Sequence, residues 1–435
     1  MFRRKKKLLK FRPNNSVTLL ENGDKFFPLL LRRIRRAQRE IFLETFILEQ
    51  DRVGDAIKRA VLQAAKRGVW VCITVDSYGS HFLPQEYIND LTEVGVIFQI
   101  FEPQPKWFGS RPNLFRRLHR KLAVIDSTFA FIGGINFAHN HLLEYGDSAK
   151  QDYTVEITGP IVDDIRSCCK ELINRSNQPP VPVRSDNRVL PPGNIDIAFI
   201  CRDNHHNRTS IEKAYLKAIK EAKHRIYIAN AYFFPGYRIM HALRKASRRG
   251  VDVSIILQGD PDIPLALRAA RSLYDGLTEE GIKVYEYMRR PLHAKIAIID
   301  DAWSTIGSSN LDPLSLSFNL EANVVVKDKQ FNQQLYREML KLIADSRFIE
   351  RNWVKSRTIW SQLKYQMTYH LLRHIPSIIG WFPAHTPQIQ QITVKRKQRN
   401  RFLTGTSSGA DRAMESNEAI TRYFSISRFQ DSNKT

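Results

Sequence analysis

The sequence of 435 residues contains only four cysteines, and their positions exclude the usual cysteine-based sites. Cys72, Cys168, Cys169 and Cys201 have neither metal-site nor redox-motif spacing, and the adjacent Cys168 and Cys169 are poorly placed to pair with each other. This usage is typical of a protein from a reducing compartment.

Long apolar runs are also missing from the chain. No stretch approaches the roughly 18 apolar residues that a membrane-spanning helix needs. The basic residues at the start are not followed by the apolar core of a cleavable secretory signal. We therefore expect a protein that stays on the cytoplasmic side of a membrane and binds it from the surface.

Acidic residues are few compared with basic ones. The chain has 44 Asp and Glu against 67 Lys and Arg, a formal net charge of +23. Such a charge favours a polyanionic partner, either nucleic acid or an anionic lipid surface. The basic N-terminal segment 1–16 includes the run Arg3 to Lys7 beside Phe2, Leu8 and Leu9, a pattern that fits a polybasic membrane contact or, equally, a solvated tail.

The chain does contain one short motif twice, with identical internal spacing. The first copy consists of His119, Lys121, Asp126, Gly133, Gly134 and Asn136, and the second of His293, Lys295, Asp300, Gly307, Ser308 and Asn310. A single His-x-Lys followed by Asp is a weak pattern, and a core strand ending near a basic surface would explain it. Two copies in similar surroundings favour a catalytic site over that explanation.

The residue types of the motif suit a phosphodiester. The apolar runs from Leu122 to Ile125 and from Ile296 to Ile299 predict buried strands, on which each His would share a face with its own Lys. Two imidazoles, two ammonium groups and two Asn amides could grip the nonbridging oxygens. One imidazole could attack phosphorus while the other protonates the leaving oxygen, without any metal or cofactor.

The motif aspartates have a different expected role. Asp126 and Asp300 lie an odd number of residues from the His and Lys of their motifs, so a regular strand would turn them away from the site. Within the catalytic motif, we interpret them as structural partners of buried polar groups and not as bases.

The duplication extends beyond the motif. Ile41 to Leu43 and Ile226 to Ile228 are strand-like, and an amphipathic helix follows each. Both helices end in a basic residue and a glycine, Arg67-Gly68 and Arg249-Gly250, a favourable C-terminal stop. Strands and helices then alternate in the same order, which predicts an α/β fold with two similar halves.

Composition predicts the boundaries. Five prolines between residues 174 and 193 indicate a linker. The expected parts are a basic segment 1–16, a first half 17–173, a linker 174–193, a second half 194–350, an amphipathic segment 351–387 and a polar, disordered tail 388–435.

Two aromatic segments are candidate lipid contacts. The loop from about Glu102 to Leu118 carries Trp107, Phe108 and Phe115, and it fits either a lid or a solvated insertion. In the C-terminal segment, an apolar face recurs at helical steps, which fits a helix lying in a membrane interface or one packed on the catalytic domain. This face consists of Trp360, Leu363, Met367, Leu371 and Ile375.

The paired motif resembles that of the phospholipase D superfamily, and it is most similar to bacterial cardiolipin synthases of the B type, which lack N-terminal membrane spans. Further matching stretches are Leu20 to Gly23, Leu43 to Phe46, Gln151 to Tyr153, Ala229 to Gly236 and Gly307 to Ser317. The resemblance implies two phospholipase D-like αβ(α) sandwich halves related by duplication, with the active site at their interface. It also implies that Asp152 and Glu321 orient the imidazoles.

The resemblance further implies synthesis of cardiolipin and glycerol from two phosphatidylglycerol molecules. His119 would form a phosphatidyl-histidine, and His293 would protonate the departing glycerol. Lys121, Lys295, Asn136 and Asn310 would hold the phosphate, with Gly133, Gly134, Gly307 and Ser308 beside it. The expected partners are phosphatidylglycerol and the anionic cytoplasmic surface of the cell inner membrane, without nucleic acid.

Three alternatives stay open at this point: a hydrolytic phospholipase D, a nuclease of the same superfamily, and a catalytically silent membrane-binding module. The motif does not distinguish water from a lipid hydroxyl as the acceptor. Losing a single His or Lys would suffice for a silent module, and both motifs are complete.

Overall fold

A computed structural model of the chain describes residues 9–103, 116–173, 193–260, 264–301, 303–353, 358–360, 363, 367 and 388–392. These residues belong to one compact unit that spans Met1–Thr393. Three predicted features lie outside the described residues: the lid residues Trp107, Phe108 and Phe115, the basic run Arg3 to Lys7, and residues 174–192 of the predicted linker 174–193.

The two halves have the same order of elements. The first contains β1 (Phe11–Glu21), α1 (Asn22–Arg35), β2 (Glu40–Thr45), α2 (Arg52–Lys66), β3 (Trp70–Asp76), α3 (Gln85–Glu93), β4 (Ile97–Phe101), β5 (Leu122–Ile125), β6 (Phe129–Gly133), the 3-10 turns η1 (His139–His141) and η2 (Leu143–Ser148), β7 (Tyr153–Thr158) and α4 (Val162–Ile173). The second contains β8 (Ile195–Arg202), α5 (Ser210–Glu221), β9 (Arg225–Asn230), α6 (Tyr237–Arg248), β10 (Asp252–Gln258), α7 (Pro264–Arg271), α8 (Tyr274–Thr278), β11 (Lys283–Tyr287), β12 (Lys295–Ile299), β13 (Trp303–Gly307), α9 (Pro313–Ser317), β14 (Glu321–Lys327), α10 (Lys329–Ala344) and β15 (Ser346–Phe348), with β16 (Ile389–Ile392) last. This order confirms the predicted duplicated α/β fold.

Local sequence accounts for the matching elements. The apolar runs of β5 and β12 are fully buried, as predicted. Helices α2 and α6 end at the predicted stops, where Gly68 and Gly250 both have φ of +86°. That left-handed conformation favours glycine, because any other side chain would crowd the backbone.

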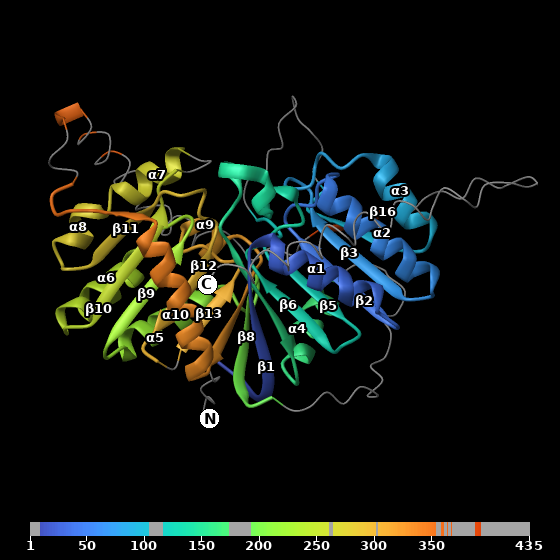
Figure 1. Cartoon of the computed structure of the whole chain (residues 1–435), viewed down its shortest axis with the longest axis horizontal. Helices are drawn as coiled ribbons and strands as arrows, with labels where there is room; N and C mark the ends of the chain where they lie inside the picture. The colour runs from blue at the N-terminus through green and yellow to red at the C-terminus, as the bar shows by residue number, and fades with distance from the viewer. Residues whose placement is uncertain are drawn as a thin grey trace, which may run out of the picture. The chain divides into compact units, whose positions relative to one another are not determined.

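The strands among the described residues form one sheet that is symmetric about its centre. Its order is β15-β11-β10-β9-β12-β13-β14-β8-β1-β7-β6-β5-β2-β3-β4-β16, so the second half repeats the first outward from the β8–β1 pair. In Figure 1 the strands of the halves spread to either side of β8 and β1. The antiparallel pairing of β1 with β8 makes the sheet continuous between the halves.

The cores lie on the two faces of this sheet. On one face, α1 and α2 cover the first half with a core that includes Leu30 and Ile57, and α5 and α6 cover the second with a core that includes Ile219 and Leu243. On the other face, α4 and α10 contribute Ile165 and Leu335, among others, to a core that contains strands of both halves. The halves therefore share one core as well as one sheet.

Two predicted boundaries do not match the elements. Strand β1 starts at Phe11, so the proposed boundary between segment 1–16 and the first half falls inside a strand that the sheet needs. Residues 389–392, placed in the disordered tail, instead form β16, which pairs antiparallel with the edge strand β4. Polar composition did not reveal this strand, because Gln390 and Gln391 lie at a sheet edge where side chains stay partly exposed.

In the parts of the chain that the structure describes, no helix combines the length and the apolar character needed to cross a bilayer.

Candidate active site

Each motif histidine is preceded by a short segment that pairs with the opposite half. Leu118 forms a parallel bridge with Leu320, and Leu292 forms one with Gln151. Next to these bridges, the His119 N–H donates to Leu320 O (2.9 Å) and the His293 N–H donates to Gln151 O (2.8 Å). These contacts hold His119 beside Glu321 and His293 beside Asp152.

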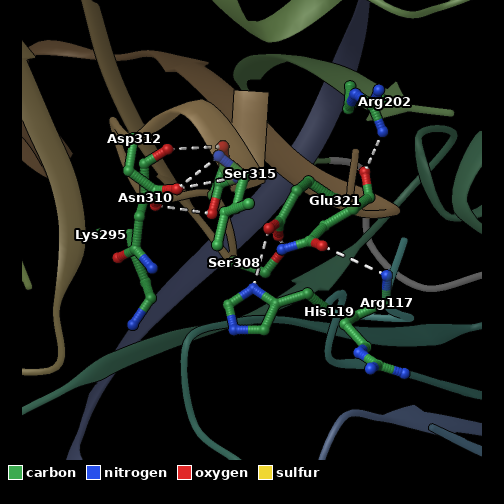
Figure 2. A network of polar contacts seen from close by, with 12 residues as sticks. Arg117, His119, Arg202, Lys295, Ser308, Asn310, Asp312, Ser315 and Glu321 are labelled. Carbon is green, nitrogen blue, oxygen red and sulfur yellow. Dashed lines mark hydrogen bonds and ion pairs between the residues drawn. The ribbon is translucent and has the colours of Figure 1, made fainter. Parts of the chain in front are cut away.

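The two histidine–carboxylate pairs cross between the halves. His119 Nδ1 lies 2.9 Å from Glu321 Oε1, and His293 Nδ1 lies 2.5 Å from Asp152 Oδ2. Figure 2 shows the first pair, with Lys295 and Asn310 from the second half near the His119 ring. When Nδ1–H donates to a carboxylate, Nε2 of the neutral ring is left unprotonated and can act as a nucleophile or proton acceptor.

The motif lysines lie close to their own histidines. Lys121 Nζ donates to His119 O at 2.6 Å, and Lys295 Nζ makes the equivalent contact with His293 O. Burial lowers the pKa of Lys121 to about 7. The ring of Phe46 lies 5.2 Å from the His119 ring and 5.3 Å from Lys121 Nζ, measured to its centroid, and it forms an apolar wall beside them.

The motif asparagines are buried near the same place. Asn136 and Asn310 are 2% and 3% exposed. Asn136 Oδ1 accepts the Ile47 N–H at 3.3 Å, whereas Asn310 Oδ1 is buried without a hydrogen-bond partner. Such an unpaired polar atom in a dry site is a candidate for contact with a ligand.

The small motif residues pack against the carboxylate strands. A Cβ atom at Gly134 would lie 2.3 Å from Asp152 Oδ1, and one at Gly307 would lie 2.4 Å from Ala322 O. Gly133 is similarly close to Thr154. At the position of Gly134, the second half has Ser308, whose hydroxyl donates to Glu321 Oε2. These residues therefore bring the carboxylates close to the ends of β6 and β13, and substrate contact by them stays a prediction.

The motif aspartates face away from the site, at turns. Asp126 accepts the backbone N–H groups of Gln38, Arg39 and Glu40. Asp300 accepts the corresponding groups of Lys223, His224 and Arg225. These partners are backbone N–H groups of the turns that lead into β2 and β9, so both aspartates have the structural role that the sequence analysis predicted. A role as bases in the reaction is incompatible with this placement.

Burial and positive charge dominate the protonation of the site. Burial lowers the pKa of His119 to about 4, and burial with nearby lysines puts the pKa of His293 well below its usual value. Burial raises the pKa of Asp152 to about 7 although Lys295 opposes the shift. At neutral pH His119 is thus uncharged, while the His293–Asp152 pair can retain an added proton.

Several residues of the site have no signal in the motif itself. Arg202 is 1% exposed and donates to Asn204 Oδ1 and to the carbonyls of Ser317 and Asn319, so it fixes the loop before Glu321. Arg120, between His119 and Lys121, forms a buried bidentate pair with Glu44. His141 lies beside His293. Comparing the repeats gives no signal for it, because Ser315 occupies the corresponding position of the second half.

A metal ion is a poor match for this site. Among the described residues, the ligating atoms of His141, Asp152 and His293 lie within 4.8 Å of one another, which resembles a metal-binding trio. However, the positive charges of Lys121, Lys150 and Lys295 act on all three residues and disfavour a cation. The same charges favour an anion.

Comparison with known proteins adds independent information. The sequence model of a family described as "Cardiolipin synthase, PLD-like domain" matches residues 30–171 and 215–343. The chain is 47% identical to cardiolipin synthase B of Salmonella typhi over 390 residues and to that of Escherichia coli K12 over 393 residues, in each case 88% of this chain and 94% of the relative. The solved structure of phosphatidylserine synthase from Haemophilus influenzae matches with a TM-score of 0.63 at 13% identity, covering 86% of this chain and 96% of that one, a likeness of fold.

Proposed function

Because the chain belongs to the family of cardiolipin synthases with phospholipase D-like domains, we propose that it transfers a phosphatidyl group from one phosphatidylglycerol to another, giving cardiolipin and glycerol. The observation that carries this proposal is the crossed arrangement of two histidine–carboxylate pairs around buried lysines and asparagines. That arrangement supplies a nucleophile, an acid and a set of anion-binding groups within one site.

In the first step, Nε2 of His119 attacks the phosphorus of phosphatidylglycerol. A P–N bond forms and the bond from phosphorus to the glycerol oxygen breaks, while His293 gives its proton to that oxygen. Burial lowers the pKa of both histidines, so His119 is neutral at pH 7 and available as the nucleophile, and the acid role of His293 depends on the proton that it shares with Asp152. The raised pKa of Asp152 supports proton storage on the His293–Asp152 pair.

In the second step, the acceptor phosphatidylglycerol gives a hydroxyl proton to His293, and its oxygen attacks phosphorus as the P–N bond breaks. Cardiolipin leaves, and both histidines return to their starting state. Lys121, Lys295, Asn136 and Asn310 hold the nonbridging oxygens in both steps. Asp152 and Glu321 orient the imidazoles and stabilise their charged forms.

The same proposal includes a membrane partner, the anionic cytoplasmic surface of the inner membrane. The net charge of +23 supports it. Ile359, Trp360, Leu363 and Met367 are all exposed, with Trp360 at 75%, so these residues are available to lipid. The remaining members of the predicted apolar face, Leu371 and Ile375, lie outside the described residues.

The deciding experiment is turnover of labelled phosphatidylglycerol in mixed micelles with chelator present. Cardiolipin and glycerol should form with the native protein and not with His119→Ala or His293→Ala. Phosphatidic acid as the main product would instead indicate a hydrolase. No lipid product would direct attention to nucleic acid, and liposome binding without turnover would indicate a silent module.

A further inference from the structure

His141 lies outside both motifs, yet it is buried within the active site. It is the last residue of η1 and is 0% exposed. Its ring lies 5.5 Å from that of His293, in an edge-to-face arrangement. A ring nitrogen of His141 is within 4.8 Å of the Asp152 carboxylate and of a His293 nitrogen. His141 is therefore a neighbour of the pair that stores the transferred proton.

The hydrogen bonds of His141 define its protonation state. Its Nε2 accepts the backbone N–H of Asn136 at 3.2 Å, so that nitrogen carries no proton. The proton of the neutral ring is then on Nδ1, which is buried and has no hydrogen-bond partner. Burial and the charges of Lys150, Lys295 and Lys121 hold the pKa of His141 well below its usual value, so the ring stays neutral.

The two carboxylates that accept from the motif histidines differ in their second side-chain donor. Glu321 accepts from His119 at one oxygen and from the Ser308 hydroxyl at the other. Asp152 accepts from His293 and from the Tyr153 N–H (2.8 Å), but Gly134 stands where Ser308 does in the repeat. A side chain there would collide with Asp152. His141 Nδ1–H is a buried donor without a partner, and a ring nitrogen of His141 lies within 4.8 Å of an Asp152 carboxylate oxygen.

We propose that His141 is a positioning residue for the transfer reaction, and that its Nδ1–H donates to Asp152 as the His293–Asp152 pair gives up its proton. This inference rests on the proposed function for the identity of that proton's acceptor. This donation requires His141 Nδ1 to come within the roughly 3 Å of a hydrogen bond from an Asp152 oxygen. An added donor stabilises the carboxylate, which makes the pair a stronger acid towards the leaving oxygen.

Two substitutions separate this role from simple packing. His141→Asn keeps an N–H donor near the position of Nδ1, whereas His141→Gln places its amide near Nε2, where its oxygen can accept the Asn136 N–H without donating to Asp152. We expect His141→Gln to lower kcat on the order of 10- to 100-fold with KM for phosphatidylglycerol changed less than about twofold. His141→Asn should retain most of kcat.

The pH profile supplies a second readout. The charged groups that act on the His293–Asp152 pair are Lys121, Lys150 and Lys295, and the titratable ring of His141 also faces the pair. Because loss of the donor favours protonated Asp152, the alkaline limb of kcat should move to higher pH in His141→Gln and stay in place in His141→Asn. Titration of the ring nitrogens in ¹⁵N-histidine-labelled protein tests the same shift at His293 without turnover.

Equal losses in two folded variants, or a loss confined to KM, would overturn the proposal. Thermal melts of both variants establish folding. If the native protein makes phosphatidic acid instead of cardiolipin, the proposed function fails, but the comparison of kcat between the variants still tests His141. If there is no turnover, an unchanged titration of His293 in His141→Gln rejects the inference.

Discussion

At the scale of single residues, the two histidines are not equivalent, although their motifs are. His119 is paired with Glu321, which also accepts from Ser308, while His293 is paired with Asp152, which is next to Gly134 and His141. This difference supports the proposed roles, nucleophile for His119 and acid for His293. They can be separated by the chemistry of the leaving group.

Asp152→Asn and Glu321→Gln should each lower kcat on phosphatidylglycerol about 10²- to 10⁴-fold, since an amide cannot stabilise an imidazolium as a carboxylate does. Nitrophenolate leaves without protonation. With phosphatidyl-p-nitrophenol, Asp152→Asn and His293→Ala should therefore regain a burst of nitrophenol, whereas Glu321→Gln and His119→Ala should not. The reverse pattern would make His293 the nucleophile.

The protonation of buried groups predicts the pH dependence of activity. Burial raises the pKa of Asp152 to about 7, so the His293–Asp152 pair loses its stored proton as pH rises above that value. Burial also lowers the pKa of Lys121 to about 7, so its charge is lost over the same range. Both changes weaken catalysis, and kcat/KM should fall above about pH 7 with a slope steeper than one proton. A profile that stays flat to pH 9 would contradict this.

At the scale of elements, the motif aspartates hold the turns that lead into β2 and β9. Asp126 and Asp300 both have φ of +52°, and each accepts three successive backbone N–H groups. The turn fixes where β2 or β9 begins, next to β5 or β12. The aspartates thereby support the site from a distance.

Asp300→Asn should lower the free energy of unfolding by about 0.5–1 kcal/mol at pH 7, because the charge on the acceptor is lost and solvent screens this partly exposed carboxylate. Burial would raise the pKa of Asp300, but the N–H groups of Arg225, His224 and Lys223 lower it overall. The native carboxylate therefore stabilises the fold fully above the unfolded value of about 3.8, and the contribution disappears as pH falls through the lower folded pKa.

Denaturant titrations of the native protein and of Asp300→Asn between pH 2.5 and 7 measure the difference in their free energies of unfolding. It should shrink towards zero at the acidic end, while kcat at 25 °C changes little. A large fall in kcat with unchanged stability would instead assign Asp300 a direct part in the reaction.

At the scale of the whole molecule, neither half holds a complete site. Each histidine takes its carboxylate from the other half, β1 pairs with β8, and one core contains strands of both halves. These contacts, and not the covalent link alone, hold the site together.

A protease site inserted between residues 174 and 192 tests whether the contacts between the halves hold the site together without the covalent link. After cleavage, the two fragments should still elute together and keep most of the activity, because the shared sheet and core are unchanged. Fragments separated in denaturant should be inactive singly and should recover activity when refolded together. Dissociation or inactivation directly on cleavage would show that the interface depends on the link.

Local sequence determines many of the helices and strands of this protein and the position of its motif. The period of the apolar residues and the glycine stops predicted β5, β12, α2 and α6, because strand and helix geometry act over a few residues. The duplicated motif likewise predicted the residues that the structure brings together at the site, and it predicted that Asp126 and Asp300 face away from them, since side chains alternate along a strand.

Only the tertiary structure decided which residues face each other across the halves. His119 meets Glu321 and His293 meets Asp152 over separations of 202 and 141 residues, and His141 joins the second pair from a 3-10 turn. The start of β1 and the strand β16 were also misplaced, because their pairing partners are supplied by distant segments. Local patterns specify each strand and its buried face, but the choice of neighbour is made by long-range packing of the complete sheet.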